Sequence, residues 1–324
     1  MTDVLPTALQ EMSETIAQVR AQLSRVIRGQ ENVVEHMLIT LVCGGHALLE
    51  GVPGTAKTLT VRALARTVTC DTKRIQFTPD LMPSDIVGTN VFNLATNAFS
   101  LHKGPVFTDL LLADEINRAP AKTQSALLEA MSERRVTIDG VRHELSPIFT
   151  VFATQNPVEF EGTYPLPEAQ QDRFLLKIPV GYPSLDAERS VLKSVHEGQP
   201  PDRLTDASVD AVINVQGVLK LREALSLVRV DEGVMEYILK AVRSTRQDES
   251  IQLGAGPRGS IFLLTTSKAR ALLQGRDFVT PDDVVAMIGP VLGHRITLSA
   301  EAEVGGMTRQ QVLQSIMDKI EVPR

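Results

Sequence analysis

Eight residues near position 50 have the types and spacing of a loop that binds phosphate groups. Residues 51–58 read Gly-Val-Pro-Gly-Thr-Ala-Lys-Thr, and they follow an apolar run, 46–50, that predicts a buried strand. The backbone amides of such a loop, and the start of the helix predicted after it, attract a β-phosphate. Lys57 can reach the β- and γ-phosphates, and the Thr58 hydroxyl can bind Mg²⁺. The alternative is a glycine-rich turn with a chance lysine, which the strand-loop-helix context disfavours.

The residue before this lysine departs from the usual pattern, in which it is glycine. Here it is Ala56, and we expect the loop to keep its shape if that position already has a helical backbone. We expect nucleotide contacts along the whole loop and into the helix, at Gly51, Val52, Pro53, Gly54, Thr55, Ala56, Lys57, Thr58 and Leu59.

Two adjacent carboxylates end a second apolar run. Residues 110–113 read Leu-Leu-Leu-Ala, and Asp114 and Glu115 follow. Because hard cations prefer oxygen ligands, we expect Asp114 to hold Mg²⁺, directly or through water. We expect Glu115 to orient and polarise a water molecule for in-line attack on a γ-phosphate. The pair alone is a weak indication of function, and it gains its weight from the phosphate loop upstream.

Three further polar residues can complete such a site. Asn156 follows a predicted strand, 148–153, which lies beside the first strand if the sheet order is 5-1-4-3-2. Its amide can bind the γ-phosphate or the water, although an Asn-Pro turn explains it equally well. Arg173 and Arg258 can stabilise charge on a γ-phosphoryl group, or they can be solvated surface arginines.

Strands and helices alternate up to about residue 182. The predicted strands are 46–50, 74–77, 109–114, 148–153 and 174–178, and the predicted helices between them include 57–68 and 120–133. This alternation predicts a parallel sheet covered on both faces. Two hairpins interrupt it, one over 135–145 with an Asp139-Gly140 turn and a weaker one over 91–101.

The pattern becomes helical after residue 182. We therefore expect an α/β domain over 1–182, which includes an N-terminal amphipathic helix over 7–27, and an all-α domain over 183–324. Plausible helix N-caps in the second domain are Thr205, Asp231, Thr280 and Thr308.

Composition excludes several classes of protein. The chain has 324 residues and a formal net charge of −6, and aromatic residues make up 4%, which argues against a dedicated nucleic-acid binder. Two cysteines are too few for a disulfide framework or a zinc site. There is no run of 18 apolar residues, so we expect a cytoplasmic protein without membrane insertion.

Together these residues resemble the AAA+ ATPases, and within them the MoxR group, over nearly all of 26–284. The most specific segments are 50–58, 114–120 and 161–174. The resemblance implies that Asn156 is sensor 1, Arg173 the arginine finger and Arg258 sensor 2. It also implies that Ile27, Gly29 and Gln30 border the adenine, and it makes alanine at position 56 ordinary.

The same resemblance implies a function. The family is expected to hydrolyse ATP to ADP and phosphate with Mg²⁺ in homo-oligomeric rings, usually hexamers, so that Arg173 acts on the nucleotide of a neighbouring subunit. Whether Arg258 acts within its own subunit stays open. The hairpins resemble the helix-2 insert and the pre-sensor-1 hairpin. Clients are protein complexes, often with a von Willebrand factor A domain partner. The alternatives are a nucleic-acid motor, a metal-chelatase motor subunit, and an ATP-sensing scaffold that does not hydrolyse.

Overall fold

The computed structural model describes residues 7–52, 54–95, 97–157, 162–198 and 209–323. Residue contacts divide the chain into two compact units. The α/β unit comprises Gln18–Phe174 and Ile178–Leu219, and the helical unit comprises residues up to Ala17, Leu175–Lys177 and residues from Lys220 onward. In the described part of the chain, no helix has the length and apolar composition needed to cross a bilayer.

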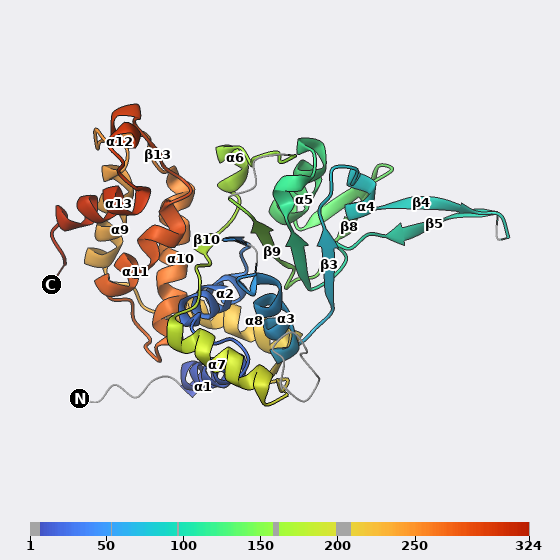
Figure 1. Ribbon diagram of the computed structural model, residues 1–324, viewed down its shortest axis with the longest axis horizontal. Coiled ribbons are helices and arrows are strands. Elements are labelled where there is room, and N and C mark those ends of the chain that lie inside the picture. Colours follow the sequence, from blue (N-terminus) through green and yellow to red (C-terminus); the bar gives the residue numbers. More distant parts are fainter. Residues whose placement is uncertain (1–6, 53, 96, 158–161, 199–208, 324) are drawn as a thin grey trace. The chain divides into compact units, whose positions relative to one another are not determined.

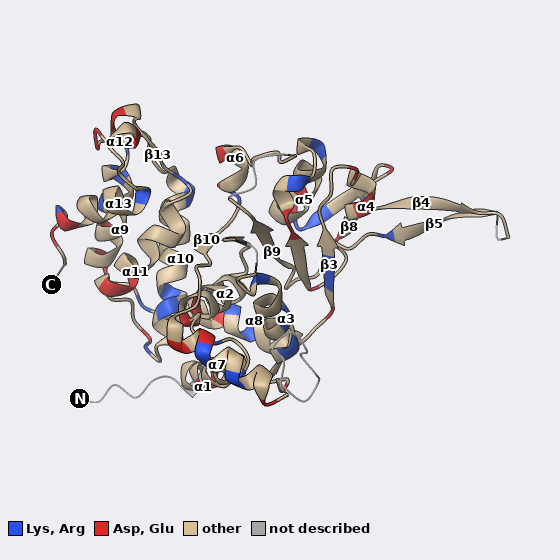
Figure 2. Ribbon diagram, in the orientation of Figure 1, with Lys and Arg blue, Asp and Glu red and all other residues tan. Residues whose placement is uncertain are grey.

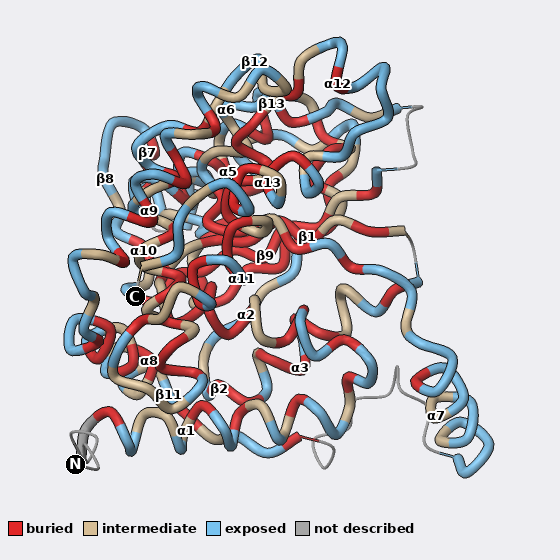
Figure 3. Tube along the Cα trace, turned by 90° about the vertical axis from the view of Figure 1, so that its left-hand side faces the viewer, coloured by how far each residue is buried: buried red, intermediate tan, exposed pale blue. Residues whose placement is uncertain are grey.

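A five-stranded sheet forms the centre of the α/β fold (Figure 1). Its strands, in spatial order, are β10 (Leu176–Pro179), β1 (Ala47–Glu50), β9 (Thr150–Gln155), β6 (Leu110–Asp114) and β3 (Thr72–Gln76). The pairs β1–β9, β9–β6 and β6–β3 are parallel. In terms of the predicted strands this is the order 5-1-4-3-2, the one under which the strand before Asn156 lies beside the first strand. All five residues of β6 are buried, and Figure 3 shows burial along β1 and β9, as expected of central strands covered on both faces.

The helices of this unit carry their apolar residues at helical spacing. In α5 (Ala121–Glu133) the buried side chains include Leu127, Leu128 and Met131, as predicted. The other elements are α2 (Glu31–Cys43), α3 (Lys57–Thr67), β2 (Val68–Thr69), α4 (Pro83–Val87), η1 (Ile116–Arg118), α6 (Glu168–Gln171), α7 (Leu185–His196) and β11 (Ile213–Asn214). Two helices, α1 (Thr7–Ser24) and α8 (Val215–Ala224), belong to this unit only in part, because residues up to Ala17 and from Lys220 onward are assigned to the helical unit.

Several predicted boundaries were wrong by a few residues. The first helix ends at Ser24 rather than at residue 27, and α3 ends at Thr67 because Val68 pairs with Ile213 in a short parallel ladder. Strands β3, β9 and β10 are displaced by up to two residues from their predicted ranges. An apolar pattern predicts where a helix or strand lies better than it predicts the residues at which that element begins and ends, because the end residues depend on tertiary pairing.

Both predicted hairpins are present. One consists of β7 (Arg135–Ile138) and β8 (Val141–Glu144), and its turn residues Asp139 and Gly140 have φ of 48° and 81°, as the predicted two-residue turn requires. The other consists of β4 (Gly88–Asn93) and β5 (Ala98–Lys103), which project from the body of their unit (Figure 1). The Asn90 amide donates to Asp139 Oδ2 at 2.8 Å, so the two hairpins touch.

The helical unit contains most of the C-terminal helices. They are η2 (Leu225–Leu227), α9 (Glu232–Ser244), α10 (Pro257–Leu273), α11 (Pro281–Leu292), α12 (Ala300–Val304) and α13 (Arg309–Asp318). The side chain of Asp231 caps α9, while Thr280 and Thr308 form capping boxes at α11 and α13. The cap expected at Thr205 lies outside the described residues. A short antiparallel pair, β12 (Ile251–Leu253) with β13 (Thr297–Leu298), joins these helices.

Contacts divide the chain at a different place from the boundary expected at 182. Of the residues beyond 182, the described segments 183–198 and 209–219 belong to the α/β unit. Two contacts explain this: Ala187 of α7 packs against Gly29, and Ile213 pairs with Val68. The change to a helical pattern after residue 182 is therefore a change of secondary structure, and the packing unit continues beyond it.

A buried carboxylate organises the helical unit. Asp283 is fully buried and accepts hydrogen bonds from Arg270 and Arg276 at 2.7 Å. Burial alone would raise the pKa of Asp283, but the hydrogen bonds from Arg276, the Thr280 backbone and Arg270 outweigh it and lower that pKa. The stability that this carboxylate contributes is therefore present at neutral pH and is lost as the pH falls through the lowered pKa.

We predict that Asp283→Asn lowers the free energy of unfolding by about 3 kcal/mol at neutral pH, because it leaves two guanidinium groups without their buried partner. Urea denaturation of the full chain measures this. The matched control is Asp282→Asn at the exposed neighbouring position, where a change within about 0.5 kcal/mol is expected. The difference in the free energy of unfolding between the wild type and Asp283→Asn should shrink as the pH falls below the ordinary pKa range of an aspartate. Equal stability of the two variants at pH 7 would contradict the prediction.

Candidate nucleotide site

The phosphate loop has the strand-loop-helix setting that the sequence predicts. It joins β1 to α3, and Gly51 opens it by donating its N–H to Gln155 O at 3.2 Å. A Cβ at position 51 would lie 2.2 Å from Val180 O, so only glycine fits there. The Lys57 ammonium donates back to the carbonyls of Gly51 and Val52. The predicted contact Pro53 lies outside the described residues.

The backbone of Ala56 does not meet the condition considered from the sequence, a right-handed helical backbone. Ala56 has φ of 59° and ψ of 20°, in the left-handed region. Gly54, two residues earlier, also has positive φ. A Cβ is costly in this region, which explains why glycine is the usual residue before the lysine. Sequence alone does not reveal the sharp turn that leads into α3.

Thr58 and Asp114 bring two oxygen donors together from different elements. The Thr58 hydroxyl, in the first turn of α3, donates to Asp114 Oδ2 at 3.2 Å. Asp114 ends β6 and is buried, and its Oδ1 accepts a 2.6 Å hydrogen bond from Thr154 of β9. A hydroxyl and a carboxylate form a hard-oxygen donor set, which suits Mg²⁺. The two residues predicted as metal ligands are therefore adjacent and fit that ion.

Glu115 is held in an unusual conformation beside Asp114. Its φ of 56° and ψ of 51° are left-handed, and its N–H donates to Thr154 Oγ1 at 2.8 Å. Its carboxylate accepts from the Gln76 amide at 2.7 Å and pairs with Arg118 at 3.0 Å. Strained backbone of this kind gathers at functional sites, where the surrounding structure fixes a side chain in one direction.

Sequence reasoning missed four residues around these carboxylates, namely Arg74, Gln76, Arg118 and Thr154. One of them, Gln76, could have been identified from the register of the sheet, because Gln76 is paired with Asp114 between β3 and β6. Arg74 lies two residues earlier on the same face, and it donates to Asp114 Oδ2 through Nη2 at 2.7 Å and through Nε at 3.2 Å.

The segment predicted to border the adenine lies against the loop. The Gln30 amide donates to Thr55 O at 3.1 Å, and its buried Oε1 has no hydrogen-bond partner among the described residues. Ile27 is buried, and Gly29 has φ of 70° with Ala187 close to its Cα. Leu59, on α3, is half-buried.

Asn156 lies beside Gly51, the first residue of the phosphate loop, at the ends of two neighbouring strands. Because Glu50 pairs with Gln155 between β1 and β9, the next residue, Asn156, is opposite Gly51. Asn156 is buried, and its carbonyl accepts from the Asn117 amide at 3.5 Å. The position agrees with the one that the sheet order predicted.

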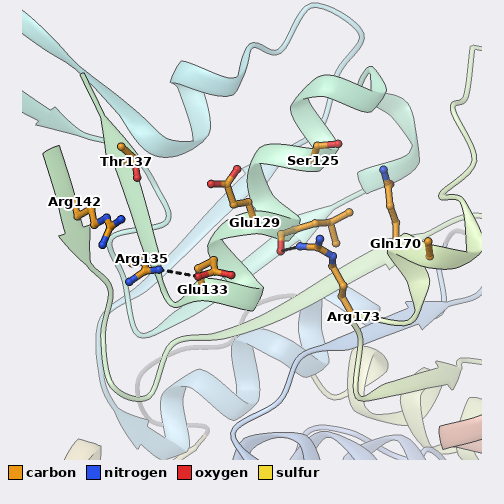
Figure 4. Close-up of a pocket in the computed structure, with 10 residues that line it drawn as sticks. Ser125, Glu129, Glu133, Arg135, Thr137, Arg142, Gln170 and Arg173 are labelled. Carbon is orange, nitrogen blue, oxygen red and sulfur yellow. Dashed lines mark hydrogen bonds and ion pairs between the residues drawn. The ribbon is translucent and has the colours of Figure 1, made fainter. Parts of the chain in front are cut away.

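The two predicted arginines lie elsewhere. Arg173 donates to Leu128 O and to Ser132 Oγ, each at 2.9 Å, and so contacts α5 (Figure 4). It lines a cavity of about 610 Å³ together with arginine and glutamate side chains of β7, β8 and α5. Arg258 is exposed as the second residue of α10 in the helical unit. Its role as a sensor stays a prediction.

Comparisons with known proteins agree with this geometry. Residues 46–176 match the family described as "ATPase family associated with various cellular activities (AAA)", and residues 243–316 match an AAA lid domain. The chaperone MoxR1 of Mycobacterium tuberculosis is 41% identical over 96% of this chain and 83% of its own length. The chain belongs to the MoxR family of AAA+ ATPases.

Two further relatives extend the MoxR-family comparison. YeaC of Bacillus subtilis, described as uncharacterized, is 46% identical over 93% of this chain and 92% of its own length. A crystal structure of a candidate ATPase from Cytophaga hutchinsonii superposes with a TM-score of 0.89 at 40% identity, and it covers 98% of this chain and 97% of its own. The α/β core with a C-terminal helical lid is therefore the fold of the family.

We predict that Ala56→Gly stabilises the protein by about 1 kcal/mol, because glycine removes the cost of a left-handed alanine. Thermal unfolding should show a rise of about 2–4 °C for a chain of this size. The matched control is Ala63→Gly inside α3, where the same substitution should destabilise by about 1 kcal/mol or more. A lower melting temperature for Ala56→Gly would contradict a left-handed Ala56.

Proposed function

We propose that this MoxR-family protein binds ATP with Mg²⁺ at residues 51–59 and hydrolyses it to ADP and phosphate. One observation carries the proposal: Lys57 and Thr58, at the start of α3, converge with Asp114 and Glu115, at the end of β6, through the 3.2 Å contact between Thr58 and Asp114. A cation, two oxygen ligands and a second carboxylate beside them are what phosphoryl transfer to water needs.

Each residue has a proposed role in this reaction. The loop amides and Lys57 hold the β- and γ-phosphates, and Thr58 with Asp114 hold the metal ion. Bound Mg²⁺ neutralises charge on the phosphate oxygens. Glu115 orients the attacking water, and the Asn156 amide binds the γ-phosphate or that water. Ile27, Gly29 and Gln30 border the adenine, where the unpartnered Oε1 of Gln30 can accept a hydrogen bond from an amino group.

The proposed arginine finger requires a second copy of the chain. Arg173 is engaged with α5 and lines an open cavity, an arrangement that supports contact with the nucleotide of a neighbouring subunit. We propose a homo-oligomeric ring, hexameric as is usual in the family, with Arg173 acting across the interface. Arg258 is proposed as sensor 2, from its own subunit or a neighbour.

We propose a protein complex as the client, and chaperone-like remodelling of it in the cytoplasm as the outcome. The β4–β5 hairpin supports this, because residues 88–101 include no charged residue (Figure 2). On the same hairpin, Leu94 and Phe99 are 87% and 72% exposed. A nucleic-acid contact would call for lysine and arginine on such a projection. A von Willebrand factor A domain protein is the proposed class of partner.

We predict that Glu115→Gln abolishes hydrolysis and spares binding, because the amide cannot polarise water but keeps the size of the side chain. Phosphate release should fall about 10²–10⁴-fold, the usual worth of a general base. Affinity for a fluorescent ATP analogue should stay within about threefold, as expected for a group that leaves the phosphate-binding residues intact. Lys57→Ala is the contrasting control and should lose binding. Hydrolysis by Glu115→Gln at the wild-type rate would refute the proposed role of Glu115. If the wild type itself binds ATP without hydrolysing it, the alternative of an ATP-sensing scaffold would be supported.

We predict that Arg173→Ala binds ATP normally but loses about 10³-fold or more in turnover, the usual worth of an arginine finger. Mixing it with Lys57→Ala should restore part of the phosphate release. In mixed rings, the intact Arg173 of a Lys57→Ala subunit can then act on the intact phosphate loop of a neighbouring Arg173→Ala subunit. Full turnover by Arg173→Ala alone, or no recovery in any mixture that forms rings, would rule out action across an interface.

A further inference from the structure

Three donor atoms, from two residues on two elements, converge on one oxygen of Asp114. Oδ2 accepts from Thr58 of α3 at 3.2 Å and from Arg74 of β3, through Nη2 at 2.7 Å and Nε at 3.2 Å. The other oxygen, Oδ1, is held by Thr154 at 2.6 Å. The carboxylate is therefore oriented with Oδ2 toward Thr58 and with a guanidinium already bound to it.

The same oxygen is the one that a metal ion beside Thr58 would need. Mg²⁺ binds oxygen ligands at about 2.0–2.1 Å and tolerates little departure from octahedral geometry. A guanidinium at 2.7 Å from Oδ2 occupies the lone pairs of that atom and carries like charge. Arg74 and the metal ion therefore exclude one another at Oδ2.

We propose that Arg74 competes with Mg²⁺ for Asp114, so that loading the metal requires the guanidinium to leave. This inference rests on the proposed function, since it concerns the same metal site. The Arg74 side chain is 54% exposed, so it can move without disturbing the core. Gln76 Oε1 accepts a hydrogen bond from Arg74 Nη2 at 2.9 Å, and it remains available as an acceptor when the guanidinium leaves Asp114.

The competition has a consequence for nucleotide binding. While Arg74 is paired with Asp114, free Mg²⁺ binds weakly at this site. Mg²⁺ that arrives bound to the nucleotide brings phosphate oxygens as further ligands, and it can displace the arginine. Arg74 thus sets the concentration of Mg²⁺ at which the nucleotide binds. Because the guanidinium is half exposed and solvent screens its attraction to Asp114, removing the competitor should shift that concentration by about two- to fivefold.

The experiment measures binding of a fluorescent, non-hydrolysable ATP analogue to the full chain at fixed analogue concentration while Mg²⁺ is titrated from EDTA. The Mg²⁺ concentration at half-maximal binding should fall about two- to fivefold in Arg74→Gln. Arg74→Lys, which keeps the charge but loses the Nε contact, should lie between it and the wild type. A thermal melt without nucleotide establishes that each variant is folded.

Two matched variants separate competition from other effects. Arg20→Gln breaks an ion pair of similar length, 3.0 Å to Glu35, on α1 and α2, and should leave the midpoint unchanged. Arg118→Gln removes the same charge from the neighbouring carboxylate, Glu115, and should shift the midpoint less than Arg74→Gln does. An unchanged or higher midpoint in folded Arg74→Gln, or an equal shift in Arg118→Gln, would overturn the inference. Absence of binding by the wild type at saturating Mg²⁺ would instead overturn the proposed function.

Discussion

The site depends on one carboxylate at the end of a fully buried strand. Asp114 is buried there, and a buried carboxylate needs partners because an unpaired buried charge costs several kcal/mol. Its partners come from three other elements: Thr58 from α3, Thr154 from β9 and Arg74 from β3. Parallel strands end at the same edge of their sheet, so this fold gathers such groups wherever a polar residue follows an apolar strand. The electrostatic requirement of one residue therefore fixes the relative positions of four elements.

Backbone strain appears at two places in this site. Ala56 and Glu115 both have left-handed φ values near 60°, and each directly follows or precedes a proposed ligand of phosphate or metal. Residues of this kind cost about 1–3 kcal/mol each and persist only where the surrounding contacts determine them. The contact between the Glu115 N–H and Thr154, and the contacts of Lys57 with the loop carbonyls, are contacts that can hold the two turns. The strain orients amides and a carboxylate before any ligand arrives.

Local patterns made much of the architecture predictable. The strand-loop-helix setting of the phosphate loop and the Asp139-Gly140 hairpin each follow from a few adjacent residues whose chemistry determines their conformation. The roles of Arg74 and Gln76 could not be read in this way, because alternating polar residues on a strand usually indicate solvent, and only the pairing of Gln76 with Asp114 shows otherwise. The left-handed Ala56 and the extent of the α/β unit to Leu219 likewise depend on tertiary contacts that no short pattern encodes.

Helix α5 is in contact both with the turn that carries Glu115 and with Arg173, the proposed finger. At one end, the buried Gln124 amide donates to Ile116 O at 3.2 Å, beside Glu115, and to Tyr164 O at 2.8 Å. One and two turns further on, Leu128 O and Ser132 Oγ accept from Arg173. The spacing of four residues places all three on one face of the helix. Because a packed helix moves as a rigid body, a shift of the turn that carries Glu115 is transmitted to the partners of Arg173. A single helix thus connects the residue proposed to act on the subunit's own nucleotide with the one proposed to act on its neighbour's.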